Sequence, residues 1–353
     1  MGRDTIVAEP ESERLVRTAT LAGRRFRVLD HYEVGREKVR EFARAVQSYH
    51  GAHHSEEQAR TLGYPSLIAP PTFASVIGLT TTRALLDTVL TEYDLSQILQ
   101  TDQVFETFRP LVAGDRITTD IIIESIRQYG DNDFITVKSV LTNQRDEVAL
   151  IGQTTIVARR GAEIDPDLTE LVSSIMMHTP PNKPAGQPDS EVLREFGDTT
   201  MDLVVDSAAA PVHTLPRFGD LVVGQELPAA TAQVTRGDLA NYSGVSGDPN
   251  PIHYSEAAAR LVGLPTVVGH GMLSMGLAGD YLTSWLGDPT AIEKFSVRLS
   301  SFVAVTKDKA SVIEFTGRIK SLDPVRRTAT VVLNGTSEGR KIFGRAVAEV
   351  RLT

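Results

Sequence analysis

The sequence has no cysteine among its 353 residues, which excludes disulfide bridges, thiolate nucleophiles and cysteine-based metal sites. It also lacks a lysine- or arginine-rich run, and 36 basic residues against 45 acidic ones give a net charge of −9. Because nucleic-acid binding needs a basic surface that neutralises phosphates, we expect no nucleic-acid partner. No segment reaches the ~18–20 consecutive apolar residues that cross a bilayer, and the charged N-terminus does not resemble a signal peptide. We therefore expect no membrane span and a cytoplasmic protein.

The length of the chain exceeds what one hydrophobic core usually supports, so we expect two domains. The segment 179–190 contains four prolines, which cannot continue a helix or a central strand, and it therefore predicts an exposed linker. The predicted division of the chain is an N-terminal arm over 1–25, a first domain over 26–161, a linker over 162–212 and a second domain over 213–353.

An internal repeat relates the two predicted domains. Residues 36–72 and 236–272 align without a gap at an offset of 200, with eight identical positions. The identical pairs are Arg36/Arg236, His53/His253, Ser55/Ser255, Glu56/Glu256, Ala59/Ala259, Arg60/Arg260, Gly63/Gly263 and Pro65/Pro265. Such self-similarity indicates two copies of one domain rather than two unrelated domains.

Each copy predicts the same order of elements: a short helix, a turn-rich loop, a second short helix, a long helix and several strands. In the second copy, Thr235 and Asp238 resemble a capping box at the start of the first helix. The long helix, from about His270 to Leu286, is apolar nearly all round and must therefore be buried on most sides. Segments rich in β-branched residues follow it in both copies. The pattern predicts an α+β fold in which an antiparallel sheet wraps a long helix in each copy.

One loop of the second copy carries the groups suited to acid–base chemistry. Asp248 and His253 lie five residues apart, and Pro249 and Pro251 stiffen the chain between them. Asn250 is suited to the turn and is expected to orient the loop. This arrangement can hold a carboxylate and an imidazole at one water molecule, where each can give or take a proton.

A second group follows where His270 and Gly271 open the long helix. Free N–H groups and the positive end of the helix dipole are found at such a start, and they can polarise a carbonyl oxygen. Taken singly, each feature also has an ordinary structural explanation: an Asx turn, a structural histidine or a plain helix start. Their joint occurrence favours an active site. Asp248, His253 and His270 also form a conceivable metal set, but no thiolate or close-spaced helical histidine pair supports it, and we expect no metal and no other cofactor.

The residues Tyr242-Ser243-Gly244, Ser246-Gly247-Asp248, Asn250-Pro251-Ile252-His253 and His270-Gly271-Met272 together resemble the MaoC-like hydratase 2 family, (R)-specific enoyl thioester hydratases with a hotdog fold. The resemblance covers about residues 213–353. It implies that Asp248 and His253 are the catalytic pair and that the Gly271 N–H binds the thioester oxygen.

The first copy departs from this pattern. Ser48 stands at the position of the catalytic aspartate, and Pro70-Pro71-Thr72 replaces His270-Gly271-Met272. His53 is retained, and the segment 105–117 resembles a strand-turn element common in the family. The whole chain resembles a fusion of the catalytic and non-catalytic subunits of a (3R)-hydroxyacyl-acyl-carrier-protein (ACP) dehydratase. This resemblance implies a double hotdog, an intramolecular pseudo-dimer that could associate further into a homo-oligomer, with the first half as a structural or tunnel-forming domain.

The resemblance implies a (3R)-hydroxyacyl-thioester dehydratase, or trans-2-enoyl hydratase in the reverse direction, acting on acyl-ACP in fatty acid elongation. Three alternatives stay open: an acyl-CoA hydratase, a non-catalytic acyl-thioester-binding protein and a thioesterase that uses Asp280 of the long helix. Candidate contacts for the phosphopantetheine arm or the carrier are Arg298, Lys307, Lys309, Arg326 and Arg327.

Overall fold

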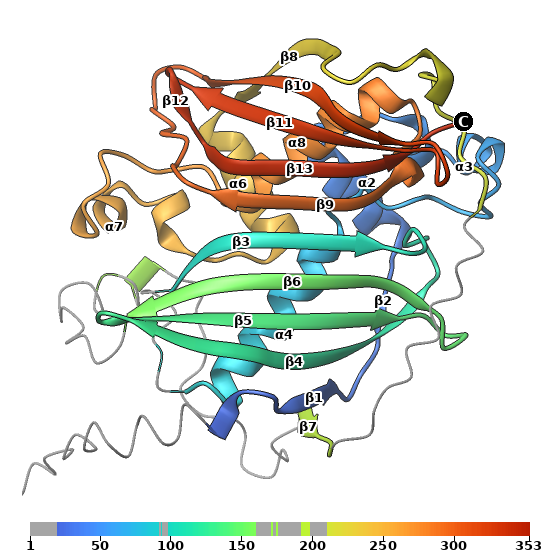
Figure 1. The fold of residues 1–353 in the computed structure, drawn as a ribbon. Helices are drawn as coiled ribbons and strands as arrows, with labels where there is room; N and C mark the ends of the chain where they lie inside the picture. The colour runs from blue at the N-terminus through green and yellow to red at the C-terminus, as the bar shows by residue number, and fades with distance from the viewer. Residues whose placement is uncertain are drawn as a thin grey trace, which may run out of the picture.

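Two halves with the same strand order form one continuous antiparallel sheet (Figure 1). The structure is a computed structural model that describes residues 20–91, 93, 98–159, 171, 174–175, 192–197 and 210–353. In the first half the sheet runs in the order β1-β4-β5-β6-β3, and the second half repeats this order in reverse as β9-β13-β11-β10-β8. This mirror arrangement is what two copies of one domain produce when they pair edge to edge.

The strands are long and alternate in burial, as expected of sheets that cover a core on one face. The strands of the first half are β1 (Arg25–Val28), β2 (Tyr32–Glu33), β3 (Ile98–Thr107), β4 (Arg116–Tyr129), β5 (Asn132–Thr142) and β6 (Val148–Arg159). Those of the second half are β8 (Glu226–Val234), β9 (Ile292–Leu299), β10 (Ser311–Asp323), β11 (Thr328–Ser337), β12 (Arg340–Lys341) and β13 (Phe343–Arg351).

The two halves meet where β3 pairs with β9. Two ion pairs bridge this junction, one from Arg298 to Asp102 at 2.7 Å and one from Lys294 to Glu106 at 3.5 Å. The junction also buries Phe105 against Phe295, which lie directly opposite each other in the register. Pairing β3 with β9 removes two exposed sheet edges at once, which would otherwise be open to association.

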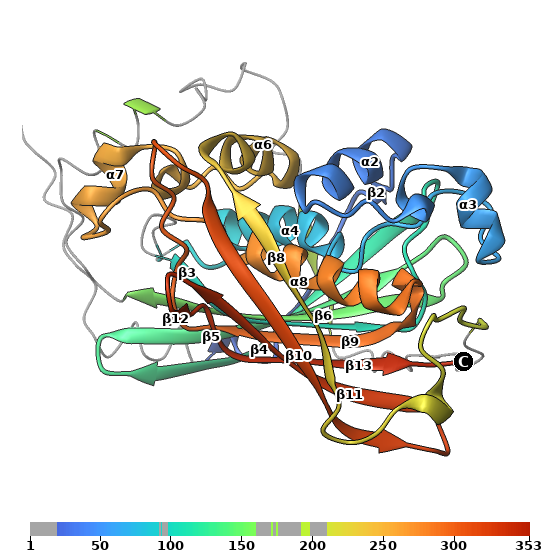
Figure 2. The ribbon, with the colours of Figure 1, turned by 90° about the horizontal axis from the view of Figure 1, so that it is seen from above.

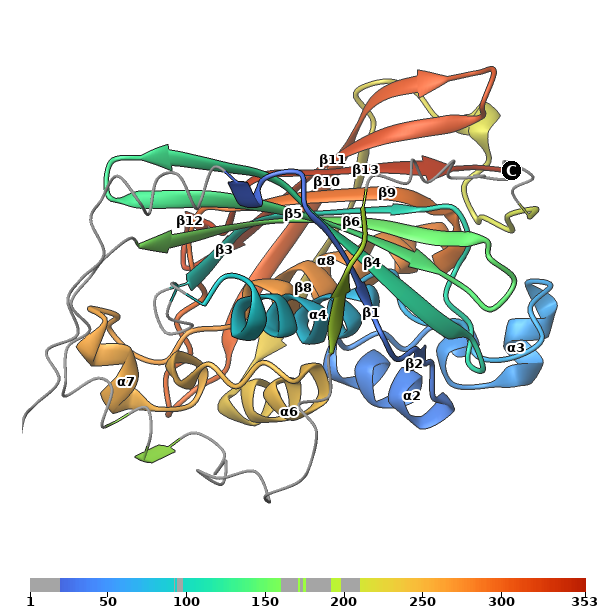
Figure 3. The same cartoon turned by 90° about the horizontal axis from the view of Figure 1, so that it is seen from below.

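The helices cover one face of the sheet in two layers. The long helices α4 (Ala74–Thr88) and α8 (Gly271–Leu286) lie against the sheet, and α2 (Arg36–Ala45) and α6 (Arg236–Ser246) lie outside them (Figures 2 and 3). The short helices α3 (Glu56–Thr61) and α7 (Glu256–Leu261) flank this outer layer. The long helix of each half is thus enclosed by its sheet, and the predicted double hotdog is confirmed.

Local sequence signals account for the second-half helices. The capping box of Thr235 and Asp238 is formed, with each side chain accepting from the other residue's backbone N–H. Gly276 lets α8 pack closely, because a Cβ there would lie 2.5 Å from Cγ1 of Val46. Burial along most of α8 fits its apolar sequence.

Equivalent contacts recur in the two halves, and the ion pairs keep the offset of 200 that the sequence repeat predicts. Arg36 forms an ion pair with Glu56, and Arg236 forms one with Glu256. Isolated β-bridges join Ile68 to Val112 in the first half and Val268 to Ala304 in the second. The repeat therefore reflects a shared architecture.

Part of the predicted arm and most of the predicted linker lie outside the described residues. At the end of the arm, Leu21 is buried and Arg25 opens β1. Within the predicted linker, β7 (Leu193–Glu195) pairs with β1 and extends the sheet. Among the described helices, none has the length and hydrophobicity required to span a membrane.

Candidate active site

A tight connection between α6 and a 3-10 turn presents Asp248. Helix α6 ends at Ser246, and Gly247 follows in the left-handed conformation with φ of 79°. Glycine adopts this conformation without the strain that a Cβ causes. The 3-10 turn Pro251–His253 begins four residues later, so the sharp reversal brings the carboxylate back toward the imidazole.

Hydrogen bonds leave one Asp248 oxygen available. The backbone N–H of Asn250 donates to Asp248 Oδ1 at 3.1 Å, and the N–H of Ile252 donates to Asn250 Oδ1 at 3.2 Å. Asn250 therefore braces the turn. Asp248 Oδ2 faces Nε2 of His253 at 3.9 Å. A single water or hydroxyl oxygen at about 2.8 Å from both atoms would bridge this gap.

The tautomer of His253 follows from its backbone contact. Nδ1 lies 2.7 Å from the carbonyl oxygen of Val268, which can only accept, so Nδ1 carries the proton. Nε2 then presents its lone pair toward Asp248. Burial lowers the pKa of His253, and the nearby Asp248 carboxylate offsets part of that shift. The neutral imidazole is the form that accepts a proton.

His270 supports the ring of His253. The two rings stack with centroids 3.7 Å apart and planes inclined by 24°. The hydroxyl of Ser243 lies 3.0 Å from Nε2 of His270, and the centroid of the buried Tyr242 ring lies 4.9 Å from that of His270. Burial, and then the neighbouring His253, hold the pKa of His270 well below its ordinary value, so the stack is a pair of neutral rings.

Gly271 is the first residue of α8, and among the described residues no side chain caps this helix start. Its N–H is therefore one of the groups that an intrahelical bond cannot satisfy. A Cβ at this position would lie 2.3 Å from Cδ1 of Leu299 at the end of β9. A side chain at position 271 would therefore have to displace the side chain of Leu299, whereas glycine leaves the helix start open beside β9.

Asp248, His253 and His270 converge, with one potential ligand atom from each within 4.8 Å of the others. The two imidazoles are stacked nearly face to face, however, and ring nitrogens bind a metal in the plane of the ring. Near-parallel stacked rings direct their lone pairs alongside each other instead of toward one point. The geometry suits proton transfer better than metal coordination.

In a comparison with known proteins, each half of the chain matches a protein-family model. The family model described as "FAS1-like, dehydratase domain region" matches residues 20–151, and the "MaoC like domain" model matches residues 220–336. A solved structure described as a MaoC-like dehydratase is 41% identical, covers 95% of this chain and 100% of its own, and superposes with a TM-score of 0.83. The chain belongs to the MaoC-like dehydratase family.

Further proteins resemble part of the chain or its fold. A UPF0336 protein of Saccharopolyspora erythraea is 38% identical over 145 residues, which are 41% of this chain and 92% of that protein. The Mycobacterium tuberculosis protein Rv0216, described as a double hotdog, superposes with a TM-score of 0.59 over 94% of this chain and 96% of its own. At 12% identity it supports the fold alone.

The first half of this MaoC-like chain keeps the histidine and its backbone contact but not the carboxylate partner. Nδ1 of His53 donates to the carbonyl oxygen of Ile68 at 2.6 Å, as His253 does to Val268. Burial lowers the pKa of His53 to about 3. Ser48 stands where Asp248 stands in the second half, and its buried hydroxyl faces Asp280 of α8. Burial raises the pKa of Asp280 to about 6.

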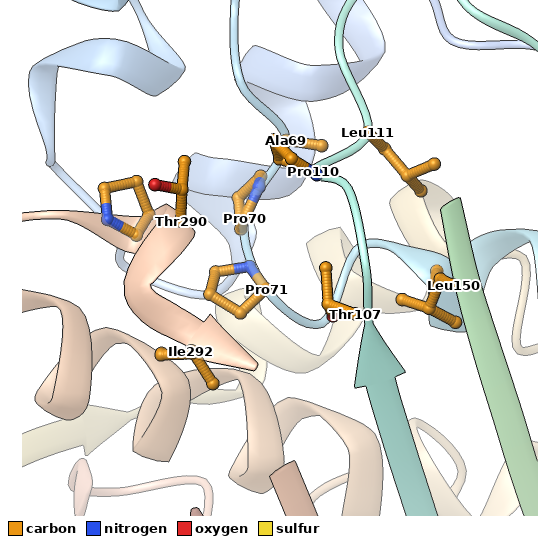
Figure 4. A pocket seen from close by; sticks show the side chains of 11 residues that line it. Ala69, Pro70, Pro71, Thr107, Pro110, Leu111, Leu150, Thr290 and Ile292 are labelled. Atoms are coloured by element: carbon orange, nitrogen blue, oxygen red, sulfur yellow. The ribbon is translucent and has the colours of Figure 1, made fainter. Parts of the chain in front are cut away.

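The start of the first-half long helix also differs. Pro71 has no N–H, and α4 begins only at Ala74, three residues after the position equivalent to Gly271. A hollow lies beside this start (Figure 4), with Pro70, Pro71 and Thr107 in its wall. Its eleven lining residues include no ionisable side chain. This hollow therefore offers no group for acid–base chemistry.

Sequence reasoning missed a contact that the first half makes with the site. The hydroxyl of Ser75 on α4 faces the hydroxyl of Tyr242, which is fully buried. Nothing local in the sequence indicates a contact between residues so far apart in the chain. The sequence offers one indication of this contact: Ser75 carries a hydroxyl at the position where the second copy of the repeat has the apolar Met275.

The basic candidates for carrier contacts divide into two groups. Arg298 and Arg326 form ion pairs with Asp102 and Glu293, respectively, and Arg327 lies 6.0 Å from the centre of the Phe218 ring. Lys307 and Lys309 are exposed. They follow Val303 and Val305, whose backbones bond to residues 269 and 267 just before the start of α8. Because this pairing is antiparallel, the two lysines continue past residue 267, away from Gly271.

Proposed function

We propose that this chain is a hydro-lyase that interconverts a trans-2-enoyl thioester and water with a (3R)-3-hydroxyacyl thioester. The observation that carries this proposal is the pair of facing atoms at the active site, Asp248 Oδ2 and His253 Nε2, 3.9 Å apart. Two groups at this separation can act on one hydroxyl or water molecule. The thioester itself acidifies C2, so the chemistry calls for no metal and no other cofactor.

In dehydration, His253 takes the proton from C2, and the electron pair of that C–H bond forms the C2–C3 double bond. The C3–O bond breaks as the departing hydroxyl receives that proton, passed on from His253 with the help of Asp248, and leaves as water. Both groups are thereby restored. Exchange of the two roles gives the same products with the same proton count.

The helix start would stabilise the charge that develops on the substrate. As C2 loses its proton, the thioester oxygen gains enolate character. The Gly271 N–H is suited to donate to this oxygen, since no side chain in the described part of the chain caps the helix start. One donor of this kind contributes on the order of 10²–10³ in rate.

We further propose that the physiological substrate is carried by ACP in fatty acid elongation, with the reaction running as dehydration. The match of the first half to a FAS1-like dehydratase region supports this assignment. The exposed Lys307 and Lys309, which follow the segment that pairs with residues 267–269, would attract an acidic carrier, although the net charge of −9 opposes one. A CoA thioester would use the same reacting groups.

The test is an absorbance assay of enoyl thioester hydration with both carriers at several chain lengths, with chiral analysis of the product. We expect (3R)-hydroxyacyl product and higher kcat/KM on ACP. Lys307→Glu with Lys309→Glu should lower kcat/KM on ACP and leave pantetheine thioesters unaffected. Higher kcat/KM on CoA would favour an acyl-CoA hydratase instead. No hydration on either carrier at any length would leave acyl-thioester binding without turnover as the function.

A further inference from the structure

Gln100 of β3 reaches the start of α8 from the other half of the chain. Its side-chain Nε2 donates to Sδ of Met272 at 3.2 Å. Met272 directly follows Gly271, which opens α8. The first half of the chain thus supplies a polar side chain beside the reacting groups of the second half.

A β-bulge in β3 turns Gln100 toward this helix start. In the pairing of β3 with β6, the register shifts between Gln100 and Asp102, so Thr101 is an extra residue. Side chains three residues apart in a regular strand point to opposite faces. The extra residue brings Gln100 to the same face as Gln103, to which it donates a hydrogen bond, whereas the neighbouring Leu99 is exposed. Bulges that re-aim a side chain in this way are common next to active sites.

Hydrogen bonds of Gln103 fix which end of the Gln100 amide faces the helix. Nε2 of Gln103 donates to the carbonyl oxygen of Val104 at 3.1 Å, which leaves its Oε1 as an acceptor. This Oε1 accepts from the Thr154 hydroxyl at 2.8 Å and from Gln100 Nε2 at 2.9 Å. Gln100 therefore directs its N–H groups, and not its carbonyl oxygen, toward Gln103 and Met272.

One of these N–H groups has a weak partner. A thioether sulfur is a weak hydrogen-bond acceptor, whereas an amide carbonyl oxygen is a strong one. The methionine side chain is also flexible and can move aside. Gln100, Met272 and Gly271 are each half-buried, so this part of the helix start is not enclosed by protein. A carbonyl oxygen on a bound molecule can therefore replace the sulfur as the partner of Gln100.

The strand pairing also brings Gln100 close to the proposed oxyanion site. β3 pairs with β9 through Asp102 opposite Arg298, and the two strands continue beyond this pair to Gln100 and Leu299 (Figure 1). Leu299 lies against the start of α8, because a Cβ at Gly271 would lie 2.3 Å from its Cδ1. The ends of both strands therefore border the helix start.

We propose that Gln100 binds the first amide carbonyl of a pantetheine arm whose thioester oxygen lies at Gly271. The assignment of an acyl thioester as ligand rests on the proposed function. In a pantetheine arm, two methylene groups separate the thioester sulfur from this amide. Consecutive residues lie about 3.8 Å apart, so an arm held at Gly271 brings the amide to the neighbourhood of Met272. The first half thereby selects thioesters of pantetheine for the half that carries the reacting groups.

The test compares two crotonyl thioesters that differ in this amide. Crotonyl N-acetylcysteamine carries the amide, and S-pentyl thiocrotonate has a chain of the same length without it. Gln100→Met keeps the length of the side chain and removes its N–H groups; Gln100→Leu takes its place if Gln100→Met melts below wild type. Gln128→Met, at the exposed end of β4, is the matched control. Crotonyl-CoA and crotonyl-ACP are measured in parallel.

A net hydrogen bond between neutral groups corresponds to a factor of about 3–10. We expect Gln100→Met to raise the KM of crotonyl N-acetylcysteamine by this factor and to leave that of the S-pentyl thioester within about twofold of wild type. Because the arm is held equally before and during the reaction, kcat should change little on either thioester. The rise in KM should be the same on CoA and on ACP, since both carry the same arm. Gln128→Met should match wild type throughout.

An unchanged KM for crotonyl N-acetylcysteamine in Gln100→Met would overturn this inference and leave the proposed reaction intact. An equal rise for both thioesters, or a rise on one carrier alone, would overturn it as well. If wild type hydrates neither thioester, the proposed reaction fails. Calorimetric binding of the two saturated butanoyl thioesters then decides the role of Gln100: a loss confined to the amide-bearing thioester supports it, and any other result overturns it.

Discussion

Gly271→Ala tests how strongly the activity depends on the position of the start of α8 relative to the reacting groups. The added Cβ would lie 2.3 Å from Cδ1 of Leu299, whereas non-bonded carbons require about 3.5 Å. The helix start and Leu299 must therefore separate by about 1.2 Å, unless Leu299 rotates away. A displacement of about 1 Å at a reacting group can cost 10²-fold in rate. We expect kcat/KM to fall about 10²-fold, which corresponds to about 2.7 kcal/mol of transition-state stabilisation.

The assay is hydration of a crotonyl thioester followed by absorbance, with Leu299→Ala and the double variant in parallel. Leu299→Ala removes the atoms that the new Cβ would meet. We expect the double variant to recover most of the activity of Leu299→Ala, and the free energy of unfolding of Gly271→Ala to fall by about 1–3 kcal/mol from overpacking. Wild-type kcat/KM in Gly271→Ala would refute the reasoning, because the position of the helix start would then not matter.

Three further predictions concern other parts of the molecule. Burial lowers the pKa of His53 to about 3. Below pH ~6.5 the unfolded chain therefore binds a proton at His53 that the folded chain does not bind. The contribution of this histidine to the free energy of unfolding is complete above that pH and is lost as pH falls toward 3. His53→Gln should therefore reduce the slope of unfolding free energy below pH 6 by up to about 1.4 kcal/mol per pH unit, as followed by denaturant titration. Ser243→Ala removes the hydroxyl partner of His270 and should lower kcat about tenfold with little change in KM. A rise in KM as large as the fall in kcat would contradict a positioning role. Asp102→Ala breaks an exposed ion pair with Arg298 and should cost only about 0.2–1 kcal/mol in thermal unfolding, whereas a larger loss would show that the junction depends on it.

The features that sequence predicts well are those encoded within a short stretch of chain. Asp248 and His253 lie in one stiffened loop, so their meeting requires only a turn. The capping box at Thr235 is likewise local. The ungapped repeat made the double architecture predictable, since two copies of a domain that buries a long helix must pair their sheet edges.

Contacts between the halves were beyond sequence reasoning. The approach of Ser75 to Tyr242 depends on how α4 lies against α6. The approach of Asp280 to Ser48 depends in the same way on how α8 lies over the first half. Side-chain pairs of this kind form across the interface between the two halves. The whole sheet sets the geometry of that interface, and the spacing of residues within a short stretch of chain does not predict it.

The most direct test of the account is crotonyl thioester turnover by four variants that match the two halves position for position: Asp248→Asn, His253→Ala, Ser48→Ala and His53→Ala. Loss of acid–base catalysis typically costs 10²–10⁴-fold in rate. We expect a loss of this size in both second-half variants and near-wild-type turnover in both first-half variants. Retained turnover in Asp248→Asn or His253→Ala, or an equal loss in the first-half variants, would contradict a single active half at the Asp248–His253 pair.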